Sequence, residues 1–245
     1  MAPASPAPAV LEEIEAAAAA LNGAAPEEVL RWASERYGEG LTLACSFGGT
    51  SGMALVDMVS KLGLDIDVFY LDTQFLFPET YALVGEVERR YGIKPVAYRP
   101  SLSPEAQAEE FGEALWSTAL DMCCTLRKVQ PNYRALAGKG AWVTGLRQDQ
   151  SSDRRTVRAV EWDWKFGLGK ISPLAAWTED QVFDYIQEHD VPYNALHDQG
   201  YPSIGCTHCT RAVAPGEDPR AGRWAGFSKT ECGLHLSPSA SQWRS

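Results

Sequence analysis

The chain has 245 residues, of which 45% are hydrophobic, which is enough for one domain with a core and too many for a disordered chain. Its formal net charge of −10 argues against broad binding to nucleic acid or acidic membranes, although a local group of arginines still suits a small anion. No apolar run is long enough to span a membrane, and residues 1–20 carry three glutamates in place of the basic start of a signal peptide. We therefore expect a cytoplasmic protein.

Hydrophobic periodicity predicts helices that alternate with strands. Two helices are expected first, over residues 9–21 and 27–37, and residues 1–25 form a helical extension. The expected strands are 41–45, 67–71, 94–98 and 141–144, and further helices are expected over 53–62, 78–91, 126–136 and 178–189. This alternation indicates an α/β fold with a doubly wound, mostly parallel sheet, which binds ligands at the carboxyl ends of its strands. The segment 206–245 is expected to be an irregular C-terminal tail.

Six cysteines are present, and in a reducing compartment they suggest metal binding or catalysis in place of disulfides. Cys123 and Cys124 are adjacent, and Cys206 and Cys209 form a CxxC pair. Four thiolates suit zinc or an iron–sulfur cluster, and the adjacent pair favours the cluster because compact zinc sites use wider spacing. The alternative is two buried pairs that never meet. Cys45, within an apolar strand, is predicted to be a core residue.

The remaining cysteine, Cys232, lies in the polar sequence ECGLH at 231–235. An exposed thiol near cations is reactive, which makes Cys232 a candidate nucleophile, and the alternative is an incidental cysteine of the tail.

Basic residues gather next to the cysteines and the strand ends. The three groups are Arg127 and Lys128; Arg147, Arg154, Arg155 and Arg158; and Arg211, Arg220 and Arg223. Guanidinium forks match phosphate and sulfate oxygens, so the set predicts a multiply charged anionic ligand, and ordinary surface arginines are the alternative. The small residues of Ser46–Gly52 let backbone amides approach a phosphate.

These motifs, taken together, are those of a known family. The chain has SFG at 46–48, LDT-x-x-L-x-PETY at 71–81, CC-x-x-RK-x-x-P at 123–131, TG-x-R-x-DQS at 144–151, ISPLA-x-W at 171–177, YPSIGC-x-x-C at 201–209, GEDPRAGRW at 216–224 and K-x-ECGLH at 229–235. In this order the motifs resemble those of the assimilatory adenylyl-sulfate (APS) and phosphoadenylyl-sulfate (PAPS) reductases. The resemblance implies a single reductase domain over residues 1–245, with a Rossmann-like fold of the adenine nucleotide alpha-hydrolase type.

Within that family, members with both cysteine pairs look like iron–sulfur enzymes that reduce APS. The resemblance therefore implies a 4Fe–4S cluster on Cys123, Cys124, Cys206 and Cys209. It also implies that Cys232 is the nucleophile, that Lys128, Arg220, Arg223 and His235 surround the phosphosulfate, and that Ser46, Phe47, Gly48, Asp72, Thr73 and Arg147 lie at the nucleotide. Gln74 and the stretch 49–51 depart from the family pattern at the nucleotide loops.

The implied reaction is attack of Cys232 on the sulfur of APS, which leaves an S-sulfocysteine that thioredoxin or glutaredoxin then reduces to sulfite. The same resemblance is compatible with a homo-oligomer. One alternative is reduction of PAPS, or of both nucleotides. A second is an ATP-using iron–sulfur enzyme, which would carry an SGGxDS loop where this chain has Ser46–Ser51. A third is a zinc-stapled binding module without a reactive cysteine.

Overall fold

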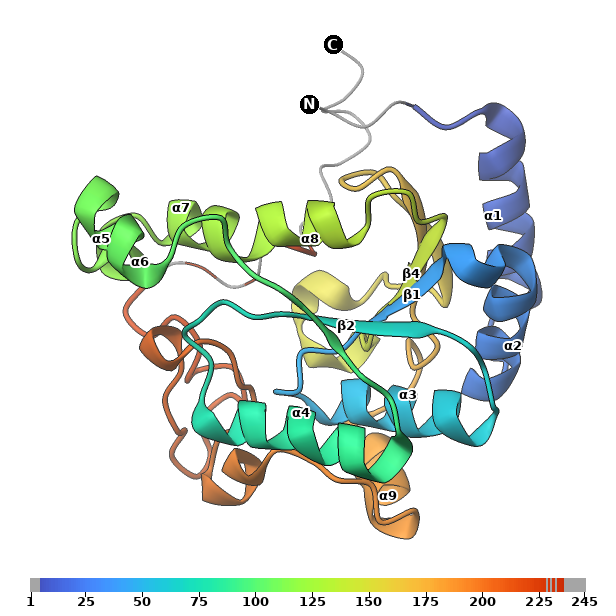
Figure 1. Cartoon of the computed structure of the whole chain (residues 1–245). Helices are drawn as coiled ribbons and strands as arrows, with labels where there is room; N and C mark the ends of the chain where they lie inside the picture. The colour runs from blue at the N-terminus through green and yellow to red at the C-terminus, as the bar shows by residue number, and fades with distance from the viewer. Residues whose placement is uncertain (1–4, 228, 230, 232, 236–245) are drawn as a thin grey trace.

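A six-stranded sheet forms the centre of the protein in a computed structural model, which describes residues 5–227, 229, 231 and 233–235 (Figure 1). The strands are β1 (Leu41–Ala44), β2 (Asp67–Leu71), β3 (Val96–Tyr98), β4 (Ala141–Val143), β5 (Val160–Asp163) and β6 (Leu168–Ile171). Their spatial order is β3-β2-β1-β4-β6-β5, and every pairing is parallel except that of β5 with β6. The predicted mostly parallel α/β sheet is confirmed.

Helices cover both faces of this sheet. They are α1 (Pro8–Ala20), α2 (Pro26–Tyr37), α3 (Thr50–Lys61), α4 (Pro78–Tyr91), α5 (Pro104–Phe111), α6 (Leu115–Thr118), α7 (Leu120–Cys124), α8 (Gln130–Ala135) and α9 (Glu179–Glu188). In Figure 1, α3, α4 and α9 lie below the sheet, α5 to α8 lie above it, and α1 and α2 lie towards one end. Within the described residues, no helix combines the length and the apolar character needed to cross a membrane.

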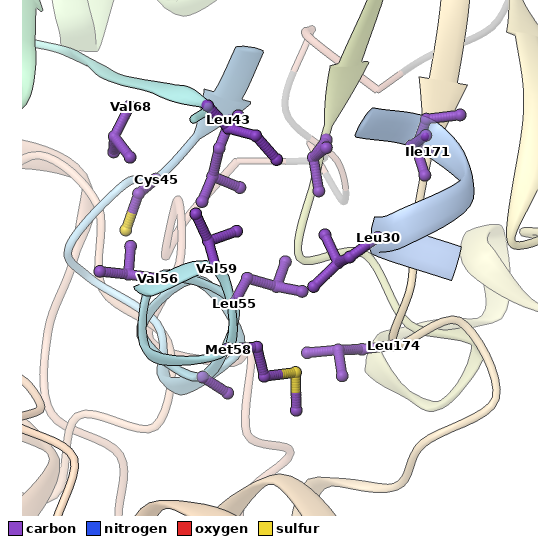
Figure 2. Packing of buried hydrophobic residues seen from close by; sticks show 14 of the residues in the cluster. Leu30, Leu43, Cys45, Leu55, Val56, Met58, Val59, Val68, Ile171 and Leu174 are labelled. Atoms are coloured by element: carbon purple, nitrogen blue, oxygen red, sulfur yellow. The ribbon is translucent and has the colours of Figure 1, made fainter. Parts of the chain in front are cut away.

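The larger core lies between the sheet and α3. Side chains alternate along each strand, so Leu43 of β1 points towards Leu55 of α3. Leu30 of α2 lies between Leu55 and Ile171 of β6, and Met58 lies next to Leu174 (Figure 2). The opposite face of the sheet, with Phe69 and Trp142, packs against Ala135 and Leu136 in and just after α8. Helix α1 belongs to the larger core, because its Ile14, Ala17 and Ala18 are buried there.

The hairpin of β5 and β6 is absent from the sequence-based prediction. Strand β6 contains Gly169 and Lys170, which are poor strand formers and hide the pattern. The structure explains both residues. A Cβ on Gly169 would lie 2.8 Å from the hydroxyl of Tyr37, and buried Lys170 pairs with Glu161 of β5 at 3.1 Å.

Candidate active site

A cleft of about 910 Å³ lies at the carboxyl ends of the strands, where the sheet order predicts a ligand site. Its walls come from the loops after β1, β2 and β4, from the helical segment that follows the adjacent cysteines, and from the chain beyond residue 196. Predicted site residues that line it are Ser46, Gly48, Thr73, Lys128, Arg147, Arg220, Arg223 and His235. Phe47 and Asp72 do not line it, and Cys232 lies outside the described residues.

The loop after β1 is shaped by close packing. Gly48 touches the chain near Ile204, because a Cβ there would lie 3.0 Å from the carbonyl oxygen of Ile204. Phe47 is fully buried in a left-handed conformation (φ 53°), its ring lies edge-on to Tyr70, and its carbonyl accepts a hydrogen bond from Asn194. Phe47 therefore anchors the loop, while the residues after it line the cleft and lead into the first turn of α3.

The loop after β2 is organised by Asp72. Its carboxylate accepts hydrogen bonds from the backbone N–H of Gln74 (3.0 Å), the hydroxyl of Tyr81 (2.6 Å) and Nε of Arg99 (2.8 Å). Burial acts to raise the pKa of Asp72, but these donors outweigh it and hold the pKa below its usual value. Asp72 thus fixes the loop that presents Thr73 to the cleft, and its expected contact with the nucleotide stays a prediction.

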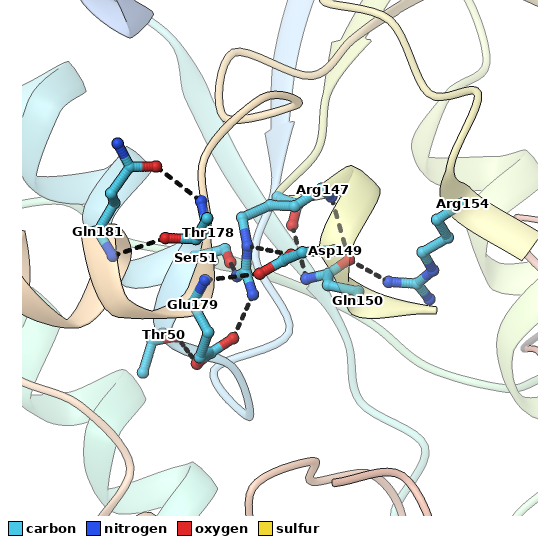
Figure 3. Close-up of polar contacts among 10 residues, drawn as sticks. Thr50, Ser51, Arg147, Asp149, Gln150, Arg154, Thr178, Glu179 and Gln181 are labelled. Carbon is cyan, nitrogen blue, oxygen red and sulfur yellow. Dashed lines mark hydrogen bonds and ion pairs between the residues drawn. The ribbon is translucent and has the colours of Figure 1, made fainter. Parts of the chain in front are cut away.

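Arg147, after β4, joins three segments (Figure 3). It is 1% exposed, and its Nε donates to Asp149 at 3.0 Å while its two terminal nitrogens donate to Ser51 and Glu179. The backbone N–H of Glu179 in turn donates to Asp149 at 2.6 Å. Because two acids flank the guanidinium, Arg147 brings little net positive charge to the cleft and instead sets the positions of α3 and α9.

The chain after residue 200 supplies two further arginines to the cleft, Arg220 and Arg223. The guanidinium of Arg223 lies 4.5 Å from the ring centre of Trp224 and that of Arg220 lies 5.6 Å from it, and Arg223 also donates to Ser203 at 3.1 Å. Gly205 leaves room for the Arg223 side chain, because a Cβ on residue 205 would lie 2.6 Å from the Arg223 guanidinium. Together with Lys128, these arginines give the cleft a cationic wall in a protein of net charge −10.

The other basic residues of the three groups lie at the cleft, at the surface or in the interior. Arg155 lines the cleft, and Arg158 and Arg211 pair with Glu15 and Glu217 at the surface. Arg127 is buried and donates to Gln107 and to the carbonyl of Thr73, both at 2.8 Å. Arg127 thus holds the loop after β2 against the cysteine-bearing segment.

Arg154 forms a two-pronged ion pair with Glu231, at 2.6 and 2.7 Å, and both side chains are buried. His235 lies parallel to the ring of Trp142, with 5.9 Å between ring centres. Burial, reinforced by the nearby cations Lys170 and Arg154, holds the pKa of His235 well below its ordinary value, so this imidazole is neutral at pH 7.

Buried polar atoms without a hydrogen-bond partner gather around the cleft. Among the described residues, they include side-chain atoms of cleft-lining Asn132, Ser151, His197, Arg223, Trp224 and His235. Buried polar groups are normally paired, so this concentration is typical of a site that is completed by a polar ligand. The sequence reasoning missed Asn132 and His197, although Asn132 follows Lys128 by four residues and so shares its helix face.

Both cysteine pairs reach one small pocket. Cys123 and Cys124 come from α7, Cys206 and Cys209 come from the loop packed beside it, and Lys128 lies at the same pocket. Burial, together with the neighbouring thiols, raises the pKa of Cys123 to about 12. Burial also raises the pKa of Cys209 to about 11, an effect that Lys128 partly opposes.

The side chains that line this pocket determine which kind of metal group it could hold. No three His, Cys, Asp or Glu side chains of the described chain form a group that would hold a metal ion as they stand. Four thiols nonetheless line the pocket together, and no carboxylate does. His208 also lines the pocket, but its ring stacks on Trp116, and the four sulfur donors fit an iron–sulfur cluster by their chemistry.

The chain has clear similarity to characterised groups of proteins. Residues 40–212 match the family model described as the phosphoadenosine phosphosulfate reductase domain. An adenosine 5'-phosphosulfate reductase of Shouchella clausii is 49% identical over 209 residues, which are 85% of this chain and 86% of the relative. The adenosine 5'-phosphosulfate reductase 2 of Bacillus subtilis is 48% identical over 209 residues, 85% and 88% of the two chains.

Solved structures agree with this similarity. A phosphoadenylyl-sulfate reductase from Candida auris, solved as a phosphate complex, superposes with a TM-score of 0.74 and 35% identity over 85% of this chain and all of the other. An FMN adenylyltransferase from Candida glabrata superposes with a TM-score of 0.56 over 98% of this chain and 83% of that one. At 14% identity the second likeness concerns the fold alone.

Proposed function

The chain belongs to the phosphoadenosine phosphosulfate reductase domain family, and we propose that it reduces adenosine 5'-phosphosulfate to sulfite and AMP in sulfate assimilation. The observation that carries this proposal is near 50% identity, over 85% of the chain, to relatives named for that reaction. The cleft supports it, because Lys128, Arg220 and Arg223 line it where a nucleotide anion would bind. Reduced thiols are abundant in the cytoplasm, where we place the reaction.

The proposed chemistry has two steps. The Cys232 thiolate attacks the sulfur of APS, an S–S bond forms, and the S–O bond breaks as AMP leaves with its electron pair. A thiolate of a dithiol partner then attacks the Cys232 sulfur and releases sulfite with the electron pair of the broken S–S bond. The partner's second thiol resolves the mixed disulfide and regenerates Cys232. The two electrons therefore come from the partner, which we propose is thioredoxin or glutaredoxin.

Charge is the main obstacle to the first step, since an anion attacks a polyanion and negative charge grows on the leaving phosphate. Lys128, Arg220 and Arg223 stabilise that charge, and one well-placed donor of this kind is worth about 3 kcal/mol. His235 is neutral, so it donates a hydrogen bond without adding charge.

We further propose that Cys123, Cys124, Cys206 and Cys209 hold a 4Fe–4S cluster. When bound, the cluster joins α7 to the CxxC loop and adds a redox-active group beside the cleft, although the thiol partner already supplies both electrons. The chain's own residues then do the chemistry. Lys128 borders both the four-cysteine pocket and the cleft, so the rigidity of that pocket sets the position of its ammonium.

PAPS is the second candidate substrate. The family description and the Candida auris structure both name phosphoadenylyl-sulfate chemistry. PAPS adds a 3'-phosphate to the ribose, and Arg155, which lines the same cleft, is the kind of additional cation that such a group requires. An ATP-using reaction is not favoured, because the loop after β1 has no aspartate between Ser46 and Ser51.

The decisive assay compares sulfite release from APS and PAPS with a dithiol reductant. We expect APS to be reduced at least about tenfold more efficiently, a difference of about 1.4 kcal/mol in transition-state binding, and the Cys232→Ser variant to release no sulfite. Mass spectrometry of the wild type incubated with APS and no thiol should find one SO₃ group on the peptide containing Cys232. Faster turnover of PAPS would show that PAPS is the preferred substrate. Sulfite release by Cys232→Ser would show that Cys232 is not the nucleophile.

A further inference from the structure

The carboxylate of Glu231 is enclosed by arginines. It is 3% exposed and accepts two hydrogen bonds from Arg154, at 2.6 Å from Nε and 2.7 Å from a terminal nitrogen. A terminal nitrogen of Arg220 lies 3.5 Å from the same carboxylate. A bidentate pair removed from water is a strong, geometrically specific contact, and removing one member leaves an uncompensated buried charge.

Neighbouring described residues are also docked. Lys229 forms an ion pair with Asp121, and Lys165 donates to the carbonyl of Gly233. Leu234 packs against the smaller core on the α8 side of the sheet. Asp121, the partner of Lys229, is 89% exposed, and the contact of Gly233 is part-buried, whereas both members of the Glu231 pair are buried. The Glu231 pair is therefore the buried ionic contact of these described residues.

We infer that Glu231 is a positioning residue. Its carboxylate and the Arg154 guanidinium form a latch that holds the described residues of the stretch 229–235 at the cleft and keeps Arg154 from binding the substrate anion. The inference rests on the proposed function only because that stretch contains Cys232. The latch itself is a property of the described residues, and it can be measured without turnover.

Arg154 is held by hydrogen bonds to two protein side chains. Two of its nitrogens donate to Glu231, and the third donates to Gln150. Three of its five guanidinium N–H groups are thus taken by protein acceptors, and the Glu231 carboxylate neutralises its charge while the latch is closed. The charges of the substrate therefore fall to Lys128, Arg220 and Arg223, although Arg154 lines the same cleft.

Substitution of either member of the pair should loosen the stretch, but the two substitutions should change anion affinity in opposite directions. Glu231→Gln and Arg154→Gln each break the latch, so both should loosen the stretch. Glu231→Gln removes a negative charge and frees Arg154, so it should bind an anion more tightly. Arg154→Gln removes a positive charge and leaves Glu231 without its main partner, so it should bind the same anion more weakly.

The experiment measures trypsin cleavage after Lys229 by mass spectrometry and AMP binding by calorimetry. Both variants should speed that cleavage at least roughly tenfold, and the dissociation constant of AMP should fall in Glu231→Gln and rise in Arg154→Gln, by about threefold or more. Arg158→Gln is the matched control, because it breaks a bidentate pair with Glu15 at the exposed surface and should change neither result.

Three outcomes would overturn the latch. The first is unchanged cleavage after Lys229 in both variants. The second is a shift of AMP affinity in the same direction in both, which would indicate a general structural loss. The third is an equal rise in cleavage after Lys139, at the far end of the sheet, because the loosening would then not be local. Since APS is not turned over, failure of the proposed reaction would show separately in the sulfite assay.

Discussion

Lys128 lies near the thiol of Cys209, whose pKa it lowers against the larger effect of burial, and it also lines the cleft that contains Arg220. It belongs to a π-helical turn, Thr125–Val129, that directly follows the adjacent cysteines. Such turns are rare and concentrate at functional sites, because the wider turn redirects side chains. In this protein the turn lets one helical segment serve both pockets.

We expect Lys128→Met to lower kcat/KM for APS by about 100-fold, because the variant lacks a cation beside the departing phosphate. Lys139→Met is the control, since Lys139 pairs with Asp67 at the surface, away from the cleft. The measurement is sulfite release at several APS concentrations. A loss below about threefold, or an equal loss in Lys139→Met, would show that Lys128 has no special part in the reaction.

Substitution of a cysteine in the four-cysteine pocket should lower the iron and sulfide content, whereas substitution of a cysteine in the core should not. Anaerobically purified wild type should be brown, with about four iron and four sulfide per chain. Cys209→Ser should lose most of both, whereas Cys45→Ala should keep them, because Cys45 is a buried residue of the main core. The readouts are the visible spectrum and the iron and sulfide content. A colourless wild type with one zinc would contradict the cluster and favour the zinc-stapled module.

The sequence predicted the sheet and the composition of the cleft better than it predicted individual contacts. Strands β1 and β2 are short apolar runs with turn signals at their ends, and such runs can be recognised without tertiary information. Strand β6 escaped because Gly169 is explained by Tyr37, which is distant in the sequence, and Lys170 by Glu161 on the neighbouring strand of the hairpin.

The same limit applied within the site. Residue type and motif indicated Arg147 and Asp72, but Glu179, which pairs with Arg147, and Arg99, which pairs with Asp72, lie in other segments. The sequence therefore did not show that both side chains are bound by protein groups. The pairing of Arg154 with Glu231 spans 77 positions and has no local signal. Charge patterns thus located the anion site, whereas the division of labour among its arginines required the structure.

His197 should make the free energy of unfolding depend on pH in the range below 6.5, the ordinary pKa of histidine. Burial lowers the pKa of His197 in the folded protein from 6.5, although Glu179 and Asp198 oppose the effect. Well above pH 6.5 both states are neutral at this residue. As pH falls below 6.5, the unfolded chain binds a proton that the folded chain does not, so the free energy of unfolding decreases, by at most about 1.4 kcal/mol per pH unit.

The measurement is urea unfolding of the wild type and of His197→Asn at pH 7.5 and pH 5.5. His197→Asn does not take up this proton, so we expect its free energy of unfolding to fall less than that of the wild type over this range. An equal fall in the two proteins would show that other groups account for the pH dependence.

A methyl group on Gly145 should disturb both stability and ligand binding. A Cβ at this position would lie 2.9 Å from the Cβ of Ser51 and 3.1 Å from the backbone nitrogen of Gly52, in the first turn of α3. Backbone atoms in a helix cannot move aside cheaply, so Gly145→Ala should lower the free energy of unfolding by about 1–3 kcal/mol. It should also weaken AMP binding, because Ser51 accepts a hydrogen bond from Arg147 and both line the cleft.

Gly85→Ala should change the free energy of unfolding in the opposite direction and serves as the control. Gly85 lies within α4, and a Cβ there would meet no atom within 4 Å. Alanine is the better helix former, so this variant should gain about 0.5–1 kcal/mol in the free energy of unfolding and leave AMP binding unchanged. If Gly145→Ala were as stable as wild type and bound AMP normally, the close approach of the loop after β4 to α3 would not constrain the cleft. A loss of stability with normal AMP binding would confine the role of Gly145 to packing.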